Sequence, residues 1–254
     1  MPDAHEIRVA AQFGSRAKAY VDSAVHAQGP DLEALEAIVD AARPARALDL
    51  GAGGGHVSYL LARHARSVVA VDLSAGMLAA VRAAASERGL SNIETAEAPA
   101  EKLPFDDGAF DFVASRYSAH HWRDFGAGLR EARRVAKQGA GATFIDACAP
   151  GLALLDTHLQ AVELLRDTSH VRDYTVAEWI AALAAAGFAL KGVQTFRIRM
   201  DYLVWIARMR TPAENARAIR ILQETAARET RSHFEIEPDG SFMLDVLLIE
   251  AKAE

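Results

Sequence analysis

The sequence is poor in cysteine, in positive charge and in long apolar runs. Cys148 is the only cysteine among 254 residues, which excludes an internal disulfide and a cluster of thiolate metal ligands. Lys and Arg number 28 against 34 Asp and Glu, and the net charge of -6 argues against a nucleic-acid partner. No apolar run approaches the length of a bilayer span, and the first residues lack a basic segment followed by an apolar one. We therefore expect a cytoplasmic protein without membrane insertion.

Short apolar segments alternate with longer amphipathic ones between residues 45 and 147. This alternation is typical of parallel strands joined by right-handed helical crossovers. Two later apolar segments are further strand candidates, and they could pair at the sheet edge. The predicted strands are 48–50, 67–71, 93–96, 110–115, 143–146, 188–198 and 242–249, and helices are expected to begin at Gly54, Ser74 and Asp124.

A glycine-rich loop follows the first predicted strand. Residues 48–55 read Leu-Asp-Leu-Gly-Ala-Gly-Gly-Gly, and Asp72 ends the next strand. Bare backbone at a strand end lets a ligand approach closely, and a carboxylate at the neighbouring strand end can accept hydrogen bonds from a ribose diol. The sequence therefore predicts an adenosine-containing cofactor. The alternative is that Asp72 only caps the helix that follows it.

The spacing of the glycines separates two kinds of cofactor. A dinucleotide site needs Gly-x-Gly-x-x-Gly, whereas this chain has His56 in place of the third glycine. The imidazole of His56 would occupy the place that a dinucleotide-binding fold keeps empty so that the helix can pack close to the first strand. Gly51, Gly53 and Gly55 instead form a Gly-x-Gly-x-Gly loop after Asp49. This pattern resembles the first motif of class I S-adenosylmethionine-dependent methyltransferases.

The resemblance extends over most of the chain from about residue 10. Residues 100–105, 108–113, 134–141 and 178–188 are similar to segments of small-molecule methyltransferases related to the ubiquinone and menaquinone C-methylating enzymes, the methyltransferase type 11 group. It implies an α/β fold: a Rossmann-like, doubly wound, seven-stranded, mostly parallel sheet with an antiparallel edge strand and a helical lid. It also implies S-adenosyl-L-methionine as methyl donor and S-adenosyl-L-homocysteine as product.

By the same resemblance we expect one methyltransferase domain over residues 1–254. Residues 45–147 would form the cofactor-binding core and residues 1–44 an N-terminal helical cover, in which Asp31 can cap the second helix. The segments 151–187 and 200–230 are helical in pattern and too long for simple connections, so they would form the lid. The lid connection 169–174 could face the substrate or form an exposed turn.

The expected cofactor site combines the glycine loop with the ends of the next strands. Tyr20 matches a helix that closes over the cofactor in similar enzymes, or is an ordinary aromatic of an amphipathic helix. Pro99 replaces an aspartate common in that family, so adenine recognition would rest on the backbone that follows, on apolar stacking or on Glu97. The predicted contacts are Tyr20, Asp49, Gly51, Ala52, Gly53, Gly55, Asp72, Leu73, Met77, Ala100, Glu101, Ser115 and Arg116.

Asp49 needs a partner, since an unpaired buried carboxylate is costly. The candidates are the cofactor ammonium, reached through water, and the N–H groups of the loop; a purely structural role is the alternative.

Two adjacent histidines follow the fourth predicted strand, where open parallel sheets place reacting groups. The segment 115–122 lacks the Asn- or Asp-Pro-Pro-aromatic tetrad of enzymes that methylate DNA bases. His121 is the first candidate for a general base and His120 the second, because imidazole titrates near neutrality; a histidine buried by helix packing is the alternative. No spacing of His, Asp or Glu resembles a metal site.

The predicted reaction is methyl transfer to a small-molecule substrate, most readily at carbon or oxygen. The residue types of the lid fit an apolar acceptor with one polar or anionic group. Two alternatives are a noncatalytic S-adenosylmethionine-binding partner protein and a nicotinamide-dependent oxidoreductase. A homodimer is left open by the sequence.

Overall fold

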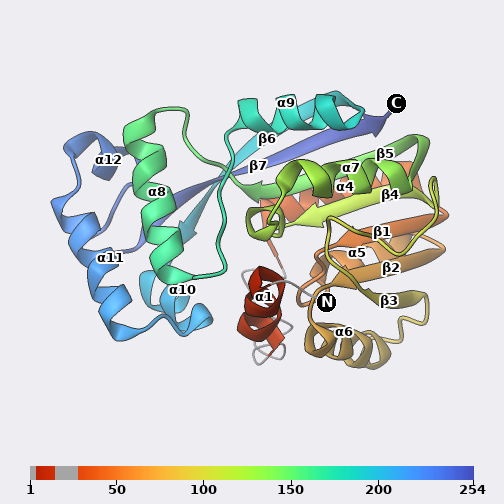
Figure 1. The fold of residues 1–254 in the computed structure, drawn as a ribbon, viewed down its shortest axis with the longest axis horizontal. Helices are drawn as coiled ribbons and strands as arrows, with labels where there is room; N and C mark the ends of the chain where they lie inside the picture. The colour runs from red at the N-terminus through yellow and green to blue at the C-terminus, as the bar shows by residue number, and fades with distance from the viewer. Residues whose placement is uncertain (1–3, 15–27) are drawn as a thin grey trace.

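The computed structural model describes residues 4–14 and 28–254 of the chain. Its centre is a seven-stranded sheet of order β3-β2-β1-β4-β5-β7-β6 (Figure 1). The pairings from β3 to β5 are parallel, and β7 is antiparallel to both of its neighbours. The mostly parallel sheet with antiparallel pairing at one edge is thus confirmed. The strands are β1 (Arg46–Leu50), β2 (Ser67–Asp72), β3 (Ile93–Glu97), β4 (Phe110–Arg116), β5 (Ala136–Ala147), β6 (Phe188–Met200) and β7 (Phe242–Ala253).

Helices cover both faces of this sheet. Side chains of successive strand residues point to opposite faces, so Leu48 packs in the core with α7 and α9 while Ala47 packs with α4 and α5. The helices are α1 (Ala4–Gly14), α4 (Pro30–Ala42), α5 (His56–His64), α6 (Ala75–Glu87), the 3-10 helix η1 (Ala119–His121), α7 (Phe125–Val135), α8 (Ala153–Arg166), α9 (Val176–Ala186), α10 (Tyr202–Met209), α11 (Ala213–Thr225) and α12 (Arg228–His233). None of the helices in the described parts of the chain has the length and apolar character of a membrane span.

Local capping explains where several helices begin. Ser74 accepts a hydrogen bond from the N–H of Met77, and Asp124 accepts one from Ala127, as the predicted helix starts require. Asp31 does not cap α4, contrary to the prediction: Gly29 is the N-cap, and the Asp31 carboxylate accepts a hydrogen bond from Arg116 Nε at 2.6 Å instead. A tertiary partner has replaced the local one.

The fifth strand is longer than the sequence predicts. It begins at Ala136 directly after α7, rather than near Thr143. The register with β4 shifts so that Phe110 pairs with Ala136 and Phe112 pairs with Gly141, which marks a bulge. The first residues of β5 form a strand because they pair with β4, and the apolar pattern of β5 alone does not indicate this pairing.

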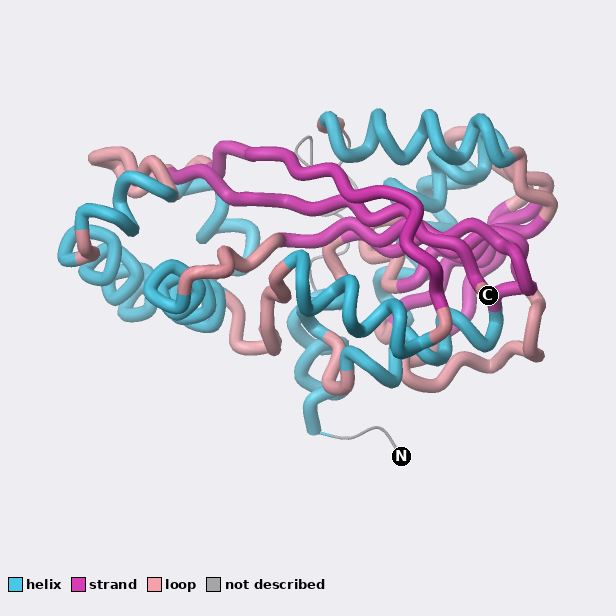
Figure 2. Tube along the Cα trace, turned by 90° about the horizontal axis from the view of Figure 1, so that it is seen from above, coloured by secondary structure: helices cyan, strands magenta, loops and turns pink. Residues whose placement is uncertain are grey.

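Strands β6 and β7 project beyond the carboxyl edge of the parallel strands. β5 follows β7 only as far as the pair Ala147 and Val246, whereas β6 and β7 remain paired up to Met200 and Phe242. Helices α8, α10, α11 and α12 gather at this projecting end (Figure 1), and the tube in Figure 2 shows the long strands reaching it. The predicted helical segment 151–187 is interrupted, because α8 ends at Arg166 and α9 begins after its cap, Thr175.

We predict that the buried ion pair between Arg116 and Asp31 is needed for stability. Both side chains are almost inaccessible, so Arg116→Met would leave a buried carboxylate without its cation. We expect the free energy of unfolding in urea to fall by about 3–5 kcal/mol. Arg43→Met is the control, since Arg43 pairs with Asp40 on the surface and its loss should cost less than about 1 kcal/mol. Equal effects of the two substitutions would refute the prediction.

Candidate functional site

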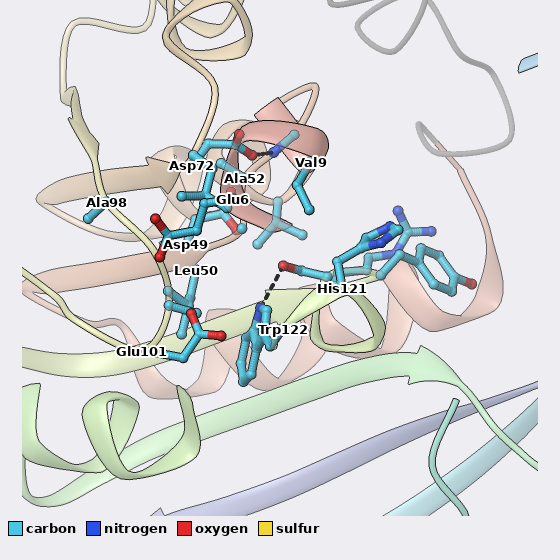
Figure 3. Close-up of a pocket in the computed structure, with 18 of the residues that line it drawn as sticks. Glu6, Val9, Asp49, Leu50, Ala52, Asp72, Ala98, Glu101, His121 and Trp122 are labelled. Carbon is cyan, nitrogen blue, oxygen red and sulfur yellow. Dashed lines mark hydrogen bonds between the residues drawn. The ribbon is translucent and has the colours of Figure 1, made fainter. Parts of the chain in front are cut away.

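A cavity lies at the carboxyl ends of β1, β2 and β4, the edge at which the sequence places the site. Figure 3 shows Asp49 and Asp72 on one side of it and His121 on the other. Helix α1 contributes to its wall, and so do the loops after β1, β2, β3 and β4. The lining residues are His5, Glu6, Val9, Asp49, Leu50, Gly51, Ala52, Gly53, Gly54, His56, Val57, Asp72, Leu73, Ala98, Ala100, Glu101, Arg116, Tyr117, Ser118, His121, Trp122 and Arg123.

The loop after β1 presents backbone to this cavity. Gly51 and Gly53 have φ angles of +78° and +49°, a left-handed conformation that glycine adopts without strain. A Cβ at Gly51 would lie 1.8 Å from Ser118 Oγ, so the loop after β4 can approach only a glycine there. A Cβ at Gly53 would meet open space. Gly51 is therefore fixed by packing and Gly53 by its backbone conformation.

Asp72 holds the glycine loop in place. Its carboxylate accepts one hydrogen bond from the N–H of Gly53 and another from the N–H of Ser74, both at 2.8 Å. Burial raises the pKa of Asp72 above its usual value, although these hydrogen bonds oppose the rise. Each carboxylate oxygen has a second lone pair, so Asp72 can still accept hydrogen bonds from a ligand in the cavity that it lines.

Asp49 is buried beneath the loop, and its partner is a side chain that the sequence analysis did not name. Ser58 on α5 donates a hydrogen bond from Oγ to Asp49 Oδ2 at 2.6 Å, in place of the predicted loop N–H groups. Burial raises the pKa of Asp49 to about 7, with the Ser58 hydrogen bond acting in the opposite direction. The group therefore gains a negative charge close to neutral pH.

Small apolar side chains form the wall beyond β3. Ala98 and Ala100 are buried and line the cavity beside Glu101, whose Oε1 accepts a hydrogen bond from the N–H of Asp124 at 3.2 Å. Pro99 and Glu97 do not line this cavity, so the carboxylate of Glu97 does not reach into it. A flat apolar ring system would fit between the alanines without a charged partner.

Three predicted cofactor residues do not line the cavity. Met77 is fully buried in α6, Ser115 is buried in β4, and Gly55 is the N-cap of α5. Tyr20 lies outside the described residues. The cavity is also lined by α1, which belongs to the expected N-terminal cover, and by Trp122, which was not predicted and whose Nε1 donates a hydrogen bond to Ser118 Oγ at 3.0 Å. The sequence indicates that residues 1–44 cover the core, but no periodicity in it identifies which side chains of α1 face the cavity.

A second cavity adjoins the first across His121 and Tyr117, which line both. It lies between the loop after β4 and the projecting end of β6 and β7. His120 lines only this second cavity. The remaining lining residues are Ala147, Glu163, Arg166, Asp167, Asp173, Ile198, Met200, Trp205, Arg208, Met209 and Leu244.

The two histidines differ in charge although their ring centroids are only 4.1 Å apart. Burial disfavours the imidazolium of His120, but Asp146, 2.5 Å from His120 Nδ1, outweighs this effect and raises the pKa to about 9. Burial lowers the pKa of His121 below its usual range, and the charge on His120 lowers it further. At neutral pH, His120 is therefore a cation and His121 is a neutral imidazole that can accept a proton.

The connection between α8 and α9 closes over these histidines. The N–H groups of Val171 and Arg172 donate to the carbonyl of His120 at 2.8 and 3.3 Å, and the Ser169 carbonyl lies 3.1 Å from His121 Nδ1. The segment is thus attached to η1 and is not a simple exposed turn. It also carries Asp173, which the sequence could not associate with His120.

His120, Asp146 and Asp173 each offer one potential metal-ligating atom within 4.8 Å of the others. Asp146, however, is already engaged: Oδ1 accepts from His120 Nδ1 and from the Ala147 N–H, and Oδ2 accepts from the His120 N–H. The group is arranged as a histidine–carboxylate pair, and we assign no metal to it.

This pair predicts a dependence of stability on pH. The pKa of His120 is about 9 in the folded chain against an ordinary 6.5, so its stabilisation is complete below pH 6.5 and is lost as the pH rises through 9. We expect the free energy of unfolding in urea to fall between pH 6.5 and 9, and His120→Gln to flatten this fall. Leu203→Gln, at a 71% exposed position without a titratable group, should keep the wild-type slope. A wild-type slope in His120→Gln would contradict the assignment.

Comparison with known proteins identifies the family. Residues 48–144 match the family described as "Methyltransferase domain". The chain is 45% identical over 197 residues to the uncharacterized protein YafE of Escherichia coli, covering 78% of this chain and 95% of that protein. It is 33% identical over 243 residues to the uncharacterized methyltransferase YcgJ of Bacillus subtilis, covering 94% of this chain and 96% of that protein.

The fold agrees with these sequence relationships. The crystal structure of YcgJ superposes with a TM-score of 0.84 at 31% identity, over 88% of this chain and 98% of that one. The similarity to this relative thus spans nearly the whole chain, both in sequence and in fold. The chain belongs to the class I S-adenosylmethionine-dependent methyltransferases.

Proposed function

We propose that the enzyme methylates a small-molecule acceptor at oxygen or carbon, with S-adenosylmethionine in the first cavity and His121 as general base. The carrying observation is the position of His121, which lines the first cavity opposite Asp72 and also faces the second. A base at this boundary can reach an acceptor while the donor occupies the other side. Its imidazole is neutral at pH 7 and keeps one unprotonated nitrogen, because burial and the charge of His120 lower its pKa, whereas His120 already carries a second proton.

The first cavity offers groups that match the parts of the donor. The remaining lone pairs of Asp72 would accept hydrogen bonds from the ribose hydroxyls, in a charge-assisted contact. The wall of Ala98 and Ala100 would receive the adenine ring, with the backbone near Glu101 available for its polar edge. The negative charge of Asp49 would favour the cationic methionine part. These roles agree with the backbone cradle around Gly53, where a larger residue would strain the loop.

The bound donor supplies a methyl group already activated by its sulfonium sulfur. The protein's task is to align the acceptor and exclude water. Trp122 and Val9 are buried against the cavity and contribute to its exclusion of solvent. As the acceptor oxygen or carbon forms its bond to the methyl carbon, the carbon–sulfur bond breaks with its electron pair left on sulfur. The acceptor proton passes to His121, and the Asp167 carboxylate, 3.9 Å from His121 Nε2, favours the imidazolium that results.

The enclosed position of His121 supports a small acceptor. Its side chain is only 13% exposed, because the connection between α8 and α9 lies over it. A folded macromolecule could not bring a reacting atom to this depth without displacing that connection. The net charge of -6 agrees with this inference.

A binding experiment tests the donor site. S-adenosylhomocysteine should bind and raise the melting temperature, whereas NAD should not. Asp72→Asn should weaken S-adenosylhomocysteine binding roughly 10- to 100-fold, since hydrogen bonds to a charged group contribute about 1.5–3 kcal/mol each. Glu97→Gln is the matched control, because this exposed carboxylate ends the neighbouring strand outside the cavity and its loss should leave affinity unchanged. Stabilisation by NAD alone would reject the proposed donor.

A kinetic experiment tests the base. With methyl-labelled S-adenosylmethionine and a metabolite extract as the source of acceptors, His121→Ala should lower the rate of labelling about 10²- to 10⁴-fold. Binding of S-adenosylhomocysteine should change by less than a few fold. His158→Ala, a histidine of α8 that contacts Phe234 and lines neither cavity, should label at the wild-type rate. Binding of the donor without any labelling by the wild type would favour a noncatalytic binding protein.

A further inference from the structure

The second cavity has two unlike walls. One is largely apolar and mostly buried, and it is formed by side chains from the projecting ends of β6 and β7 and from α10, which also contributes Arg208 to the lining. These side chains come from segments outside the parallel strands, so the second cavity lies beside the hydrophobic core and is not a gap within it. The apolar wall consists of Ile198, Met200, Trp205, Met209 and Leu244.

The charges of the opposite wall are largely matched by one another. Arg166 donates to Glu163 at 3.1 Å, and His120 pairs with Asp146 at 2.5 Å. Asp167 accepts hydrogen bonds from the N–H and hydroxyl of Ser169 at 2.8 and 2.6 Å. A ligand with a net charge would have to disrupt one of these contacts or compete with it for a partner, because little solvent reaches these groups.

Asp173 is the exception on this wall. It is 1% exposed, lines the cavity, and has an oxygen, Oδ2, that makes no hydrogen bond within the described residues, with His170 Nε2 4.0 Å away. Its backbone is fixed by Gln160 of α8, which donates to its carbonyl at 2.8 Å and accepts from its N–H at 3.1 Å. A buried polar atom without a partner is costly, so this position is adapted to a group that a ligand brings.

Burial raises the pKa of Asp173 well above its usual value, and the nearby charge of Glu163 adds to the effect. The charge of His120, within 4.8 Å, opposes this shift, and the oxygen without a partner can accept a hydrogen bond from a ligand. A ligand hydroxyl can donate a hydrogen bond to this oxygen, whereas a ligand carboxylate only accepts and a ligand ammonium would lie beside the cation of His120.

We propose that the second cavity is the acceptor chamber, and that it takes an uncharged, largely apolar compound with a hydroxyl group at one end. The hydroxyl group lies near His121 and Asp173, and the apolar body rests on the wall around Trp205 and Leu244. This inference rests on the proposed function, since methyl transfer requires the donor in the first cavity. In the reaction the hydroxyl oxygen bonds to the methyl carbon, the electrons of the carbon–sulfur bond remain on sulfur, and the hydroxyl proton goes to His121.

Four probes with one butylphenyl body test this assignment. With S-adenosylhomocysteine at saturation, 4-butylphenol should bind at least about tenfold more tightly in calorimetry than butylbenzene, 4-butylbenzoate or 4-butylbenzylammonium. Tighter binding of the benzoate would overturn the proposal in favour of an anion site beside Arg166 and Arg208. Competition between 4-butylphenol and S-adenosylhomocysteine would also overturn it, because the phenol would then occupy the donor cavity.

Two substitutions locate the phenol. Leu244→Trp would fill the apolar side and should abolish 4-butylphenol binding, while S-adenosylhomocysteine affinity in the same variant verifies its folding. Leu203→Trp, at a 71% exposed position of α10, is the matched control and should bind both. Asp173→Leu should lower phenol affinity about tenfold, to that of butylbenzene, and Asp173→Asn should restore it to within about threefold. Wild-type phenol binding by Leu244→Trp or by Asp173→Leu would refute the chamber.

The outcome separates this inference from the proposed function. Absence of S-adenosylhomocysteine binding in the wild type would remove the donor site itself. Binding of S-adenosylhomocysteine without selective binding of 4-butylphenol would leave the donor site intact and reject the acceptor chamber alone.

Discussion

The contact between Gly51 and Ser118 connects the main parts of the site. Ser118 Oγ occupies the space where a side chain of residue 51 would begin, so the loop after β4 can lie directly against the loop after β1. The same oxygen accepts the indole N–H of Trp122, which fixes the short helix η1 between them. Both histidines lie on η1. One close approach at a glycine therefore sets the shape of the first cavity and the boundary between the two cavities.

Buried charge determines how the histidines can act. The carboxylate of Asp146, from β5, keeps a proton on His120, and that cation in turn lowers the pKa of His121. Burial lowers the pKa of both imidazoles, and among the described residues only His120 has a carboxylate close enough, at 2.5 Å, to outweigh it, so the two neighbours take different protonation states. The arrangement gives one neutral imidazole facing the donor cavity and one fixed cation behind it. Two adjacent histidines thus differ in protonation state.

The projection of β6 and β7 adds the second half of the site. A parallel core alone would present its strand ends to solvent, as open sheets generally do at their carboxyl edge. Here the paired strands continue past Ala147 and support α8 and α10, which bring Glu163 and Trp205 over the edge. The first cavity therefore belongs to the core, and the second cavity belongs largely to the extension. This division explains why a glycine motif can identify the donor while leaving the acceptor open.

The sequence by itself determined the fold class, the order of the core strands and helices along the chain, and the glycine loop that lines the first cavity. These features depend on local pattern: apolar runs, helix caps such as Ser74, and glycines that only a special backbone conformation requires. It also placed Asp72 and His121 at strand ends, where parallel pairing brings them to one edge.

Only the tertiary structure decided the partners of these groups. Asp49 meets Ser58, Asp31 meets Arg116, and His120 meets Asp146 across separations that no periodicity spans. Local pattern likewise could not show that the Asp173 carboxyl lies beside His120, since a turn carries it there from beyond α8. The physical reason is that hydrogen bonds and charge interactions depend on distance in space, and for these side chains that distance is set by the packing of the whole sheet and its extension.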